Sequence, residues 1–101
     1  MAVYLHAEIH VRPGHLADML NLLEHTIVPQ MEGEGWKLLG CHTGISGPRN
    51  TIIDLWELDD LEHFRRAHAA ILGKLPPDND LRAKLDAWVE SETLTFLDKR
   101  F

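Results

Sequence analysis

Cysteine is scarce in this chain of 101 residues, in which Cys41 is the only one. A single cysteine excludes an internal disulfide framework and favours a reducing compartment, so we expect a cytoplasmic protein. Cys41 falls on a predicted strand with no cationic cluster beside it in the sequence. Because a reactive thiolate needs such surroundings, we expect a small buried side chain at this position.

Basic residues are also few. Ten Lys and Arg stand against 16 Asp and Glu, which gives a formal net charge of −6. Nucleic-acid-binding proteins need a basic stripe that neutralises phosphates, and anionic membranes attract basic surfaces. The charge balance therefore argues against nucleic acid and against a membrane surface as partners.

Long apolar runs are missing too, because no window reaches the roughly 18 consecutive apolar residues of a membrane-spanning helix. The first six residues show no basic segment followed by an apolar one, so we expect no signal peptide. The sequence contains no phosphate loop, nucleophile elbow or dinucleotide fingerprint, which argues against nucleotide-dependent chemistry.

What is present predicts one soluble globular domain over residues 1–101, since 45% of the residues are apolar and 26% are charged. A domain of this size buries only about two-thirds of the surface that its unfolded chain exposes. A deep pocket must therefore use core positions. The unusual feature is seven histidines, because histidine titrates near neutral pH and is the commonest metal ligand.

The hydrophobic period switches between the values typical of strands and of helices. Strict alternation predicts a first strand, which Pro13-Gly14 ends, and 3/4 spacing then predicts a helix that Pro29 kinks or ends. Asp59 or Asp60 is expected to cap a later helix. The predicted elements are a strand over 3–12, a helix from 15, strands over 36–45 and 51–58 that form a hairpin, a helix from 61, a further helix after Pro76-Pro77 and a strand over 93–97.

The resulting order β-α-β-β-α-(α)-β predicts an α+β ferredoxin-like domain, in which one antiparallel sheet carries its helices on a single face. The second face of such a sheet is left uncovered. We therefore expect a partner to cover it.

Two segments resemble the signature of the NIPSNAP family, which belongs to the dimeric α+β barrel superfamily. They are Leu39-Gly40-Cys41-His42-Thr43-Gly44 and Asn50-Thr51-Ile52-Ile53-Asp54-Leu55-Trp56-Glu57-Leu58-Asp59. Arg12-Pro13-Gly14 also resembles the turn that leads into the first helix of the family, and the whole resemblance spans residues 3 to 75. It implies a homodimeric barrel with a ligand cavity between the sheet and the helices of each protomer.

The chain departs from the family pattern at its expected pocket. Leu5, Ala7 and Ile9 stand where the family usually carries Glu, Arg and Tyr, and Asp54 stands where it usually carries His. The pocket wall is therefore expected to be more apolar than usual, with an acid in place of a base.

The resemblance leaves the reaction open, because a fold does not fix a function. The wider superfamily includes cofactor-free monooxygenases, polyketide and aromatic cyclases, isomerases, and haem-binding or haem-degrading enzymes. We favour an enzyme of cyclase, isomerase or lyase type that needs no cofactor and acts on a small apolar or aromatic metabolite. The alternatives are a non-catalytic module for ligand binding or interaction, and a cofactor-free monooxygenase.

The expected catalytic residues are Asp54, His42 and His68. The resemblance favours Asp54 and Trp56 on the face that looks toward the helices, and the pattern of the second strand favours His42 there too. Neighbouring strands bring side chains within reach of each other, so Asp54 and His42 are expected to form a general acid/base pair. His68 is expected to close the cavity. The expected substrate-binding residues are Leu5, Ala7, Ile9, Trp56, Phe64, Leu72 and Trp88.

A purely structural interpretation of these residues stays open. Asp54 can serve as a structural hydrogen-bond acceptor, His42 and His68 can simply fill their sites, and Trp56 suits core packing better than substrate contact. His68 is also the only reasonable candidate for a haem ligand.

His6, Glu8 and His10 alternate on the other face of the first strand. Residues two apart in a strand project the same way, so these three can share a zinc or iron ion. We favour a dimer interface and expect no metal. Protonating several histidines in one confined layer is costly, so this dimer is expected to weaken at low pH. The remaining histidines, His15, His25 and His63, are expected to be solvated.

Overall fold

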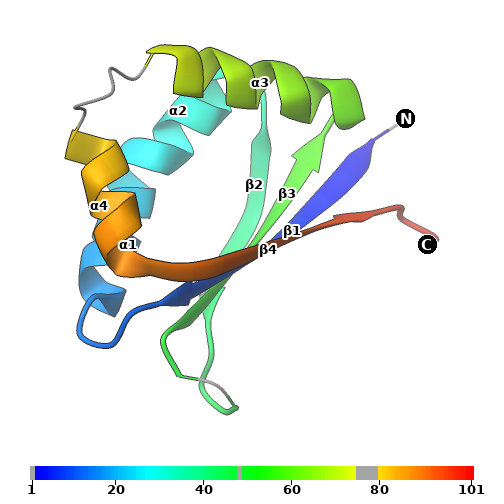
Figure 1. The fold of residues 1–101 in the computed structure, drawn as a ribbon. Helices are drawn as coiled ribbons and strands as arrows, with labels where there is room; N and C mark the ends of the chain where they lie inside the picture. Colours follow the sequence, from blue (N-terminus) through cyan, green and yellow to red (C-terminus); the bar gives the residue numbers. More distant parts are fainter. Residues whose placement is uncertain (1, 48, 75–79) are drawn as a thin grey trace.

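The fold is that of a computed structural model, which describes residues 2–47, 49–74 and 80–101. Its strands and helices follow the predicted order (Figure 1). The strands are β1 (Val3–Val11), β2 (Lys37–Thr43), β3 (Thr51–Leu58) and β4 (Val89–Leu97), and the helices are α1 (Leu16–Leu22), η1 (Leu23–Ile27), α2 (Val28–Gly33), α3 (Leu61–Lys74) and α4 (Asp80–Trp88).

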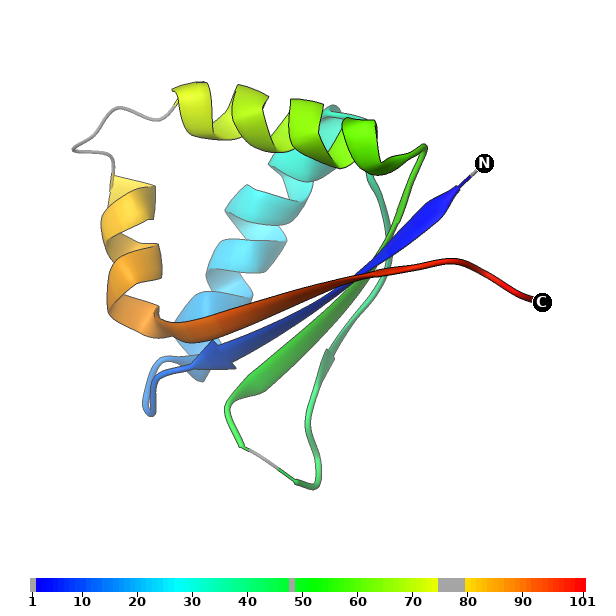
Figure 2. The same ribbon diagram turned by 45° about the vertical axis from the view of Figure 1, so that its right-hand side comes forward.

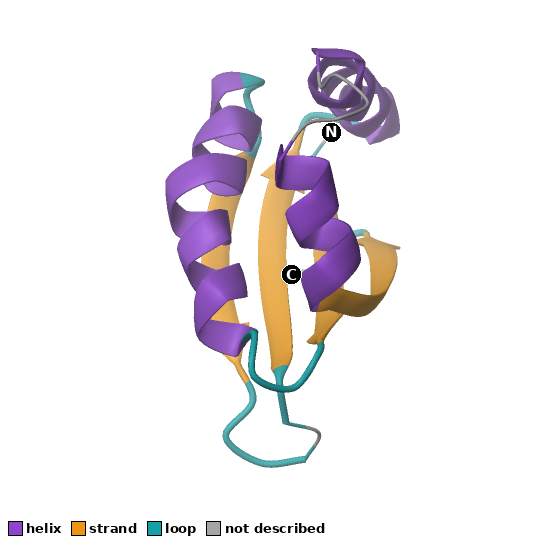
Figure 3. Ribbon diagram, turned by 60° about the vertical axis from the view of Figure 1, so that its left-hand side comes forward, coloured by secondary structure: helices purple, strands orange, loops and turns teal. Residues whose placement is uncertain are grey.

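The strands form one antiparallel sheet in the order β2-β3-β1-β4. All the helices lie on one face of this sheet, and the other face carries no helix (Figures 1 and 2). Viewed from the helix side, Figure 3 shows the helices in front of the strands. The predicted α+β ferredoxin-like arrangement is thereby confirmed. No helix in the described ranges is long and apolar enough to cross a membrane.

The first helix does not end at Pro29. It continues to Gly33 through η1, a π-helical turn in which the backbone N–H of Val28 donates to the carbonyl of Leu23. Proline has no backbone N–H, and the wider turn lies directly before it. Such π turns often occur at functional sites, and this one faces the interior of the molecule with Leu23 and Ile27.

The alternation predicted for β1 is visible in its burial. Leu5, Ala7, Ile9 and Val11 are buried under the helices, and the residues between them are half-buried on the open face. Two apolar clusters form the core between sheet and helices. One gathers Ile9, Val11, Met19, Leu22, Leu23 and Ile52, and the other gathers Leu5, Trp36, Trp56, Leu58 and Ala67.

A β-bulge breaks the alternation in β2. Leu38 pairs with Trp56, but the next paired residue, Gly40, lies opposite Leu55, so Leu39 is the extra residue. One extra residue in a strand turns every following side chain to the other face of the sheet. This shift decides which residues of β2 reach the helix side.

Candidate functional site

A cavity of about 200 Å³ lies between the sheet and the helices. We call it the sheet–helix cavity. From the sheet it is lined by residues that the sequence predicted as pocket walls, namely Leu5, Ala7, Ile9 and Trp56. The helices contribute apolar side chains, which are Met19, Leu23, Ile27, Met31, Phe64, Leu81 and Leu85. The sheet–helix cavity is thus mostly apolar, and any reaction in it would depend on its few polar side chains.

Asp54 is the most enclosed of these polar groups. It lies on β3 beside Ala7 of β1, and only 2% of its surface is exposed. The thiol of Cys41, directly opposite on β2, donates a hydrogen bond to its carboxyl group. The other carboxyl oxygen, Oδ1, is buried and has no hydrogen-bond partner within the described part of the chain.

This burial raises the pKa of Asp54 above its ordinary value of 3.8, because a low-dielectric surrounding disfavours the ionised form. The hydrogen bond from Cys41 and the charge of His42 oppose that rise. A carboxyl group with a raised pKa holds its proton closer to neutral pH and is a stronger base once ionised. It is therefore suited to general acid/base work.

Glu92 brings a second carboxyl group to the cavity. It lies on β4 opposite Ile9, so Asp54 and Glu92 flank the central strand β1 on its covered face. Loss of hydration raises the pKa of Glu92, with a further rise from the negative charge of Asp54, while His68 opposes the rise. Asp54 is buried, whereas Glu92 lies on an exposed stretch of β4, so the two carboxyl groups differ in their access to water.

His68 reaches the cavity from α3, as the sequence predicted. Its ring stacks on Phe64 at a centroid distance of 5.4 Å with an interplanar angle of 22°. The imidazole therefore has a defined orientation and lies close enough to Glu92 to favour the charged carboxylate.

Aromatic rings form one wall of the cavity. Trp36 stacks on Phe64 at 5.5 Å and meets Trp56 edge to face at 5.6 Å. Phe64 also meets Phe96 of β4 edge to face at 5.1 Å. Such pairs hold one another in place, so the wall is preformed for a flat or apolar ligand.

The expected pairing of His42 with Asp54 in one pocket is wrong. The bulge at Leu39 places His42 opposite Ile53, on the open face, with its ring over Gly40. A Cβ at Gly40 would lie 2.6 Å from Nε2 of His42, so a side chain there would displace the exposed His42 ring. His42 is thus not available to the cavity as a proton donor or acceptor.

Cys41 takes the position that was expected for His42, next to Asp54. The prediction that Cys41 is buried is also wrong, because the thiol lies on β2 at the sheet edge and is exposed. Partial desolvation, the hydrogen bond to Asp54 and the charge of Asp54 together raise the pKa of the thiol to about 12. The thiol is therefore protonated near neutral pH, as a donor to Asp54 must be.

Trp88 is not among the residues that line the cavity in the described part of the chain. Trp88, at the end of α4, stacks on His15 at 5.9 Å and packs with the cluster around Ile9. Leu72 lies outside the residues whose side chains the structure describes. The helix α4 still contributes to the cavity, but through Leu81 and Leu85.

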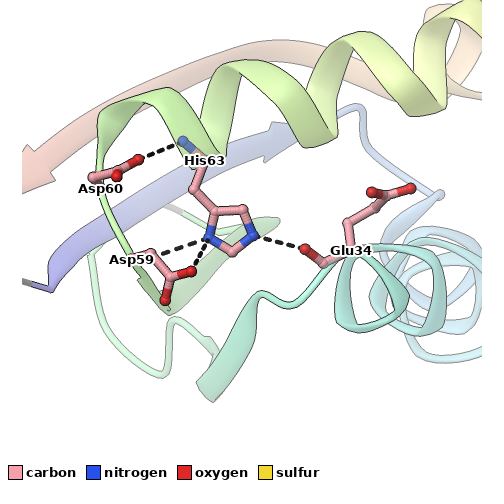
Figure 4. Close-up of polar contacts among 4 residues, drawn as sticks. All are labelled: Glu34, Asp59, Asp60 and His63. Carbon is pink, nitrogen blue, oxygen red and sulfur yellow. Dashed lines mark hydrogen bonds and ion pairs between the residues drawn. The ribbon is translucent and has the colours of Figure 1, made fainter.

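His63 is not solvated as expected, since only 6% of its surface is exposed. Figure 4 shows its ring between Asp59 and Glu34. The backbone N–H of Asp59 donates to Nδ1 at 3.1 Å, so Nε2 carries the proton and donates to the Glu34 carbonyl at 2.6 Å. The backbone N–H of His63 donates to Asp60 Oδ1 at 2.7 Å, which identifies Asp60 as the cap of α3. His63 thus joins α3 to the segment that precedes β2.

The open face of the sheet carries His6, Glu8 and His10, as predicted, and all three are half-buried. Nε2 of His10 lies 3.2 Å from Glu8 Oε2, and its Nδ1 lies 3.5 Å from the Thr51 hydroxyl. In the described ranges, no three His, Cys, Asp or Glu side chains gather where they could hold a metal ion. His25 is exposed as expected, whereas His15 is half-buried against Trp88.

Sequence reasoning missed Glu92 and the role of Trp36 in the cavity wall. Glu92 lies in phase with Leu94 and Phe96, so extending the alternation upstream would have placed it on the covered face. The prediction began that strand at Thr93, four residues after its start at Val89. Trp36 was assigned to the correct face, but its burial depends on contacts with distant elements.

Comparisons with known proteins agree with this architecture. A NIPSNAP-like domain protein from Burkholderia xenovorans is 20% identical, with a TM-score of 0.81 over 98% of this chain and 85% of that chain. A NIPSNAP family protein from Agrobacterium tumefaciens is 19% identical, with a TM-score of 0.79 over 99% and 94%. A dimeric ferredoxin-like protein from an uncultured marine organism is 14% identical, with a TM-score of 0.68 over 99% and 90%.

At these identities the structural likeness shows the fold alone. No curated protein matches the sequence significantly. The family model described as NIPSNAP, however, matches residues 4–89, which is most of the chain. The predicted resemblance is thereby confirmed, and the chain belongs to the NIPSNAP family.

Proposed function

We propose that the sheet–helix cavity binds a small apolar or aromatic metabolite and that Asp54 transfers a proton to or from it without a cofactor. The observation that carries this proposal is the state of Asp54. Its side chain is 2% exposed, its Oδ1 has no hydrogen-bond partner in the described part of the chain, and it lines an apolar cavity. Leaving a buried polar atom unpaired is costly, so such a group points to a ligand or a reaction.

Proton transfer suits the residues around Asp54. The raised pKa of Asp54 makes its carboxylate a strong base for a carboxyl group, and Glu92 with His68 forms a second place where a proton can reside. Isomerisation, cyclisation and elimination all begin with removal or addition of a proton at carbon. These residues therefore support a cyclase, isomerase or lyase in which Asp54 acts and Glu92 and His68 accept or return the proton.

Deuterium exchange tests this proposal without knowledge of the natural substrate. Small carbon acids with aromatic or apolar bodies, among them phenacyl alcohol and 1-indanone, would be incubated with the protein in D₂O and followed by proton NMR. General base catalysis contributes about 10²- to 10⁴-fold, so at least one compound is expected to lose its acidic C–H signal about 100-fold faster than in buffer. Asp54→Asn is expected to return that rate to the buffer value.

The matched control is Asp86→Asn, because Asp86 lies exposed on α4 and does not line the cavity. It should keep the wild-type rate. Exchange that persists in Asp54→Asn would remove Asp54 from the mechanism. Compounds that bind in the cavity but do not exchange would favour the non-catalytic ligand-binding alternative.

We further propose that a second copy of the chain covers the open face, with His6, Glu8 and His10 at the seam. In support, this face is apolar in part, with Leu97 43% exposed, and a structural relative is described as dimeric. Sedimentation at about pH 8 should give a dimer that weakens at about pH 5, because histidine titrates between these values. A monomer at both pH values would contradict the seam. We also propose that the protein is located in the cytoplasm.

A further inference from the structure

Two buried polar side-chain atoms have no hydrogen-bond partner in the described ranges, and both belong to residues of the sheet–helix cavity. One is Oδ1 of Asp54, and the other is Nε1 of Trp36, whose side chain is only 5% exposed. They are chemically complementary, because an indole N–H only donates and a carboxylate only accepts. Buried polar groups are nearly always paired in folded proteins, so two exceptions on one cavity call for a common explanation.

Trp36 cannot easily turn to find a partner. It follows a Schellman motif in which its own N–H donates to the Met31 carbonyl and the N–H of Gly35 donates to the Glu32 carbonyl. Gly35 adopts a φ of +90°, which favours glycine, and a Cβ there would also lie 3.3 Å from the ring of His63. The backbone before the indole is therefore fixed.

The indole ring itself is held from both sides. It stacks on Phe64 at 5.5 Å and meets Trp56 edge to face at 5.6 Å. Trp56 and Asp54 lie two residues apart on the covered face of β3, both paired with β2. One strand thus places the carboxyl group beside the ring that Trp36 contacts.

We propose that Trp36 Nε1–H donates a hydrogen bond to a carbonyl oxygen of the substrate while Asp54 acts on the neighbouring carbon. This inference rests on the proposed function and names its substrate class. The substrate is a small aromatic or apolar carbonyl compound with an acidic C–H beside the carbonyl group. An amine would leave the Trp36 donor unpaired, and a hydrocarbon has neither an acceptor for Trp36 nor an acidic C–H for Asp54.

The reaction step needs no further reactant. The Asp54 carboxylate takes the proton, the C–H bond breaks, and its electron pair forms a C=C bond while the carbonyl π electrons move to oxygen. The resulting enolate oxygen accepts the hydrogen bond from Trp36, which is stronger to an anion than to the neutral carbonyl. Return of the proton from Asp54 to another atom of the enolate gives an isomer.

A set of matched probes isolates the hydrogen bond between Trp36 and the carbonyl group of the ligand. Phenacyl alcohol carries a carbonyl and a hydroxyl group, 2-phenylethanol lacks the carbonyl, and acetophenone lacks the hydroxyl. Affinities would be measured by calorimetry for the wild type and for Trp36→Phe, which keeps an aromatic ring and removes the N–H. We expect the wild type to bind phenacyl alcohol about tenfold more tightly than 2-phenylethanol, and Trp36→Phe to lose this preference.

Trp56→Phe is the matched control, because it removes an indole from the same wall, and Nε1 of Trp56 is not among the unpaired buried atoms. It should change the affinities for both probes in parallel and keep the preference. A preference that survives in Trp36→Phe would overturn the inference. Loss of the preference together with no exchange in D₂O would support the Trp36 contact and contradict the proposed proton transfer, so the two failures are distinguishable.

A second measurement covers the case in which Trp36→Phe fails to fold. The indole N–H resonances of the wild-type protein would be followed by nitrogen-edited NMR during titration. Phenacyl alcohol and acetophenone should shift the Trp36 resonance downfield, as a new hydrogen bond does, and 2-phenylethanol should not. An equal response to all three probes would overturn the inference.

Discussion

The two faces of the sheet differ in whether their polar side chains are hydrogen-bonded. On the open face, His10 lies 3.2 Å from Glu8, and Glu57 accepts a hydrogen bond from the Tyr4 hydroxyl at 3.2 Å. On the covered face, Asp54 Oδ1 is buried and has no hydrogen-bond partner among the described residues, and the pKa of Asp54 is raised. Polar side chains that are hydrogen-bonded to one another have a structural role. A buried polar atom that lacks a hydrogen bond within the protein is available to bind a ligand.

The largest expected contrast concerns two neighbours on β3. Ile52 is fully buried on the covered face, and Ile53 is half-buried on the open face. Ile52→Ala is expected to cost about 2–5 kcal/mol of unfolding free energy, because it leaves a cavity in the core. Ile53→Ala should cost about 1 kcal/mol. Urea denaturation compares the two, and equal losses would mean that the open face is packed as tightly as the covered one.

Two histidines offer the next contrast. His63→Ala is expected to lower the unfolding free energy by about 2–3 kcal/mol, because it removes the buried ring that accepts from the Asp59 N–H and donates to the Glu34 carbonyl. His10→Ala on the open face should cost less than about 1 kcal/mol, since its contact with Glu8 is half-exposed. Thermal or urea unfolding at neutral pH measures both. A similar cost for the two variants would contradict the structural role of His63.

The pH dependence of stability separates the faces further. Because the folded pKa of Asp54 is raised, its contribution to stability is fully present below the unfolded pKa, near 3.8, and is lost as pH rises through the folded pKa. Asp54→Asn cannot ionise, so it should melt at a higher temperature than the wild type at about pH 7, with the difference vanishing near about pH 3. Melting curves across this range measure it.

The control for that comparison is Glu57→Gln, on the same strand but on the open face. Glu57 accepts from Tyr4 and lies 4.0 Å from Lys37. Its loss of charge should give no stabilisation at about pH 7. Equal stabilisation by both variants would show that overall negative charge, not burial of Asp54, is responsible.

The smallest expected effect concerns Cys41, at the edge of the covered face. Its pKa of about 12 predicts slow alkylation by iodoacetamide at about pH 8, even though the thiol is exposed. Desolvation is the largest cause of this raised pKa, and the hydrogen bond to Asp54 and its charge add to it, so Asp54→Asn should accelerate alkylation a few-fold. An unchanged alkylation rate in Asp54→Asn would show that Asp54 and Cys41 do not interact.

Local pattern was enough to predict most of the elements and the pocket wall of β1. Alternation in β1 depends only on neighbouring residues, so the faces of Leu5, Ala7 and Ile9 were predicted correctly. His42 was misplaced because the bulge at Leu39 shifts the faces by one residue. Gly40 was a signal for that bulge, since an isolated glycine in a strand is typical of one. His63 was misplaced because Glu34, its partner, lies 29 residues away.

The amino-acid sequence by itself determined the family, the order of the elements and the presence of one apolar and one polar face on the central strand. These follow from local periodicity and from motifs that neighbouring residues carry. Only the tertiary structure decided that Asp54, Glu92, His68 and Trp36 share a cavity and that His42 does not. Burial and unsatisfied hydrogen bonds depend on which strands and helices pack together. Contacts between residues that are far apart in the sequence cannot be predicted from local periodicity.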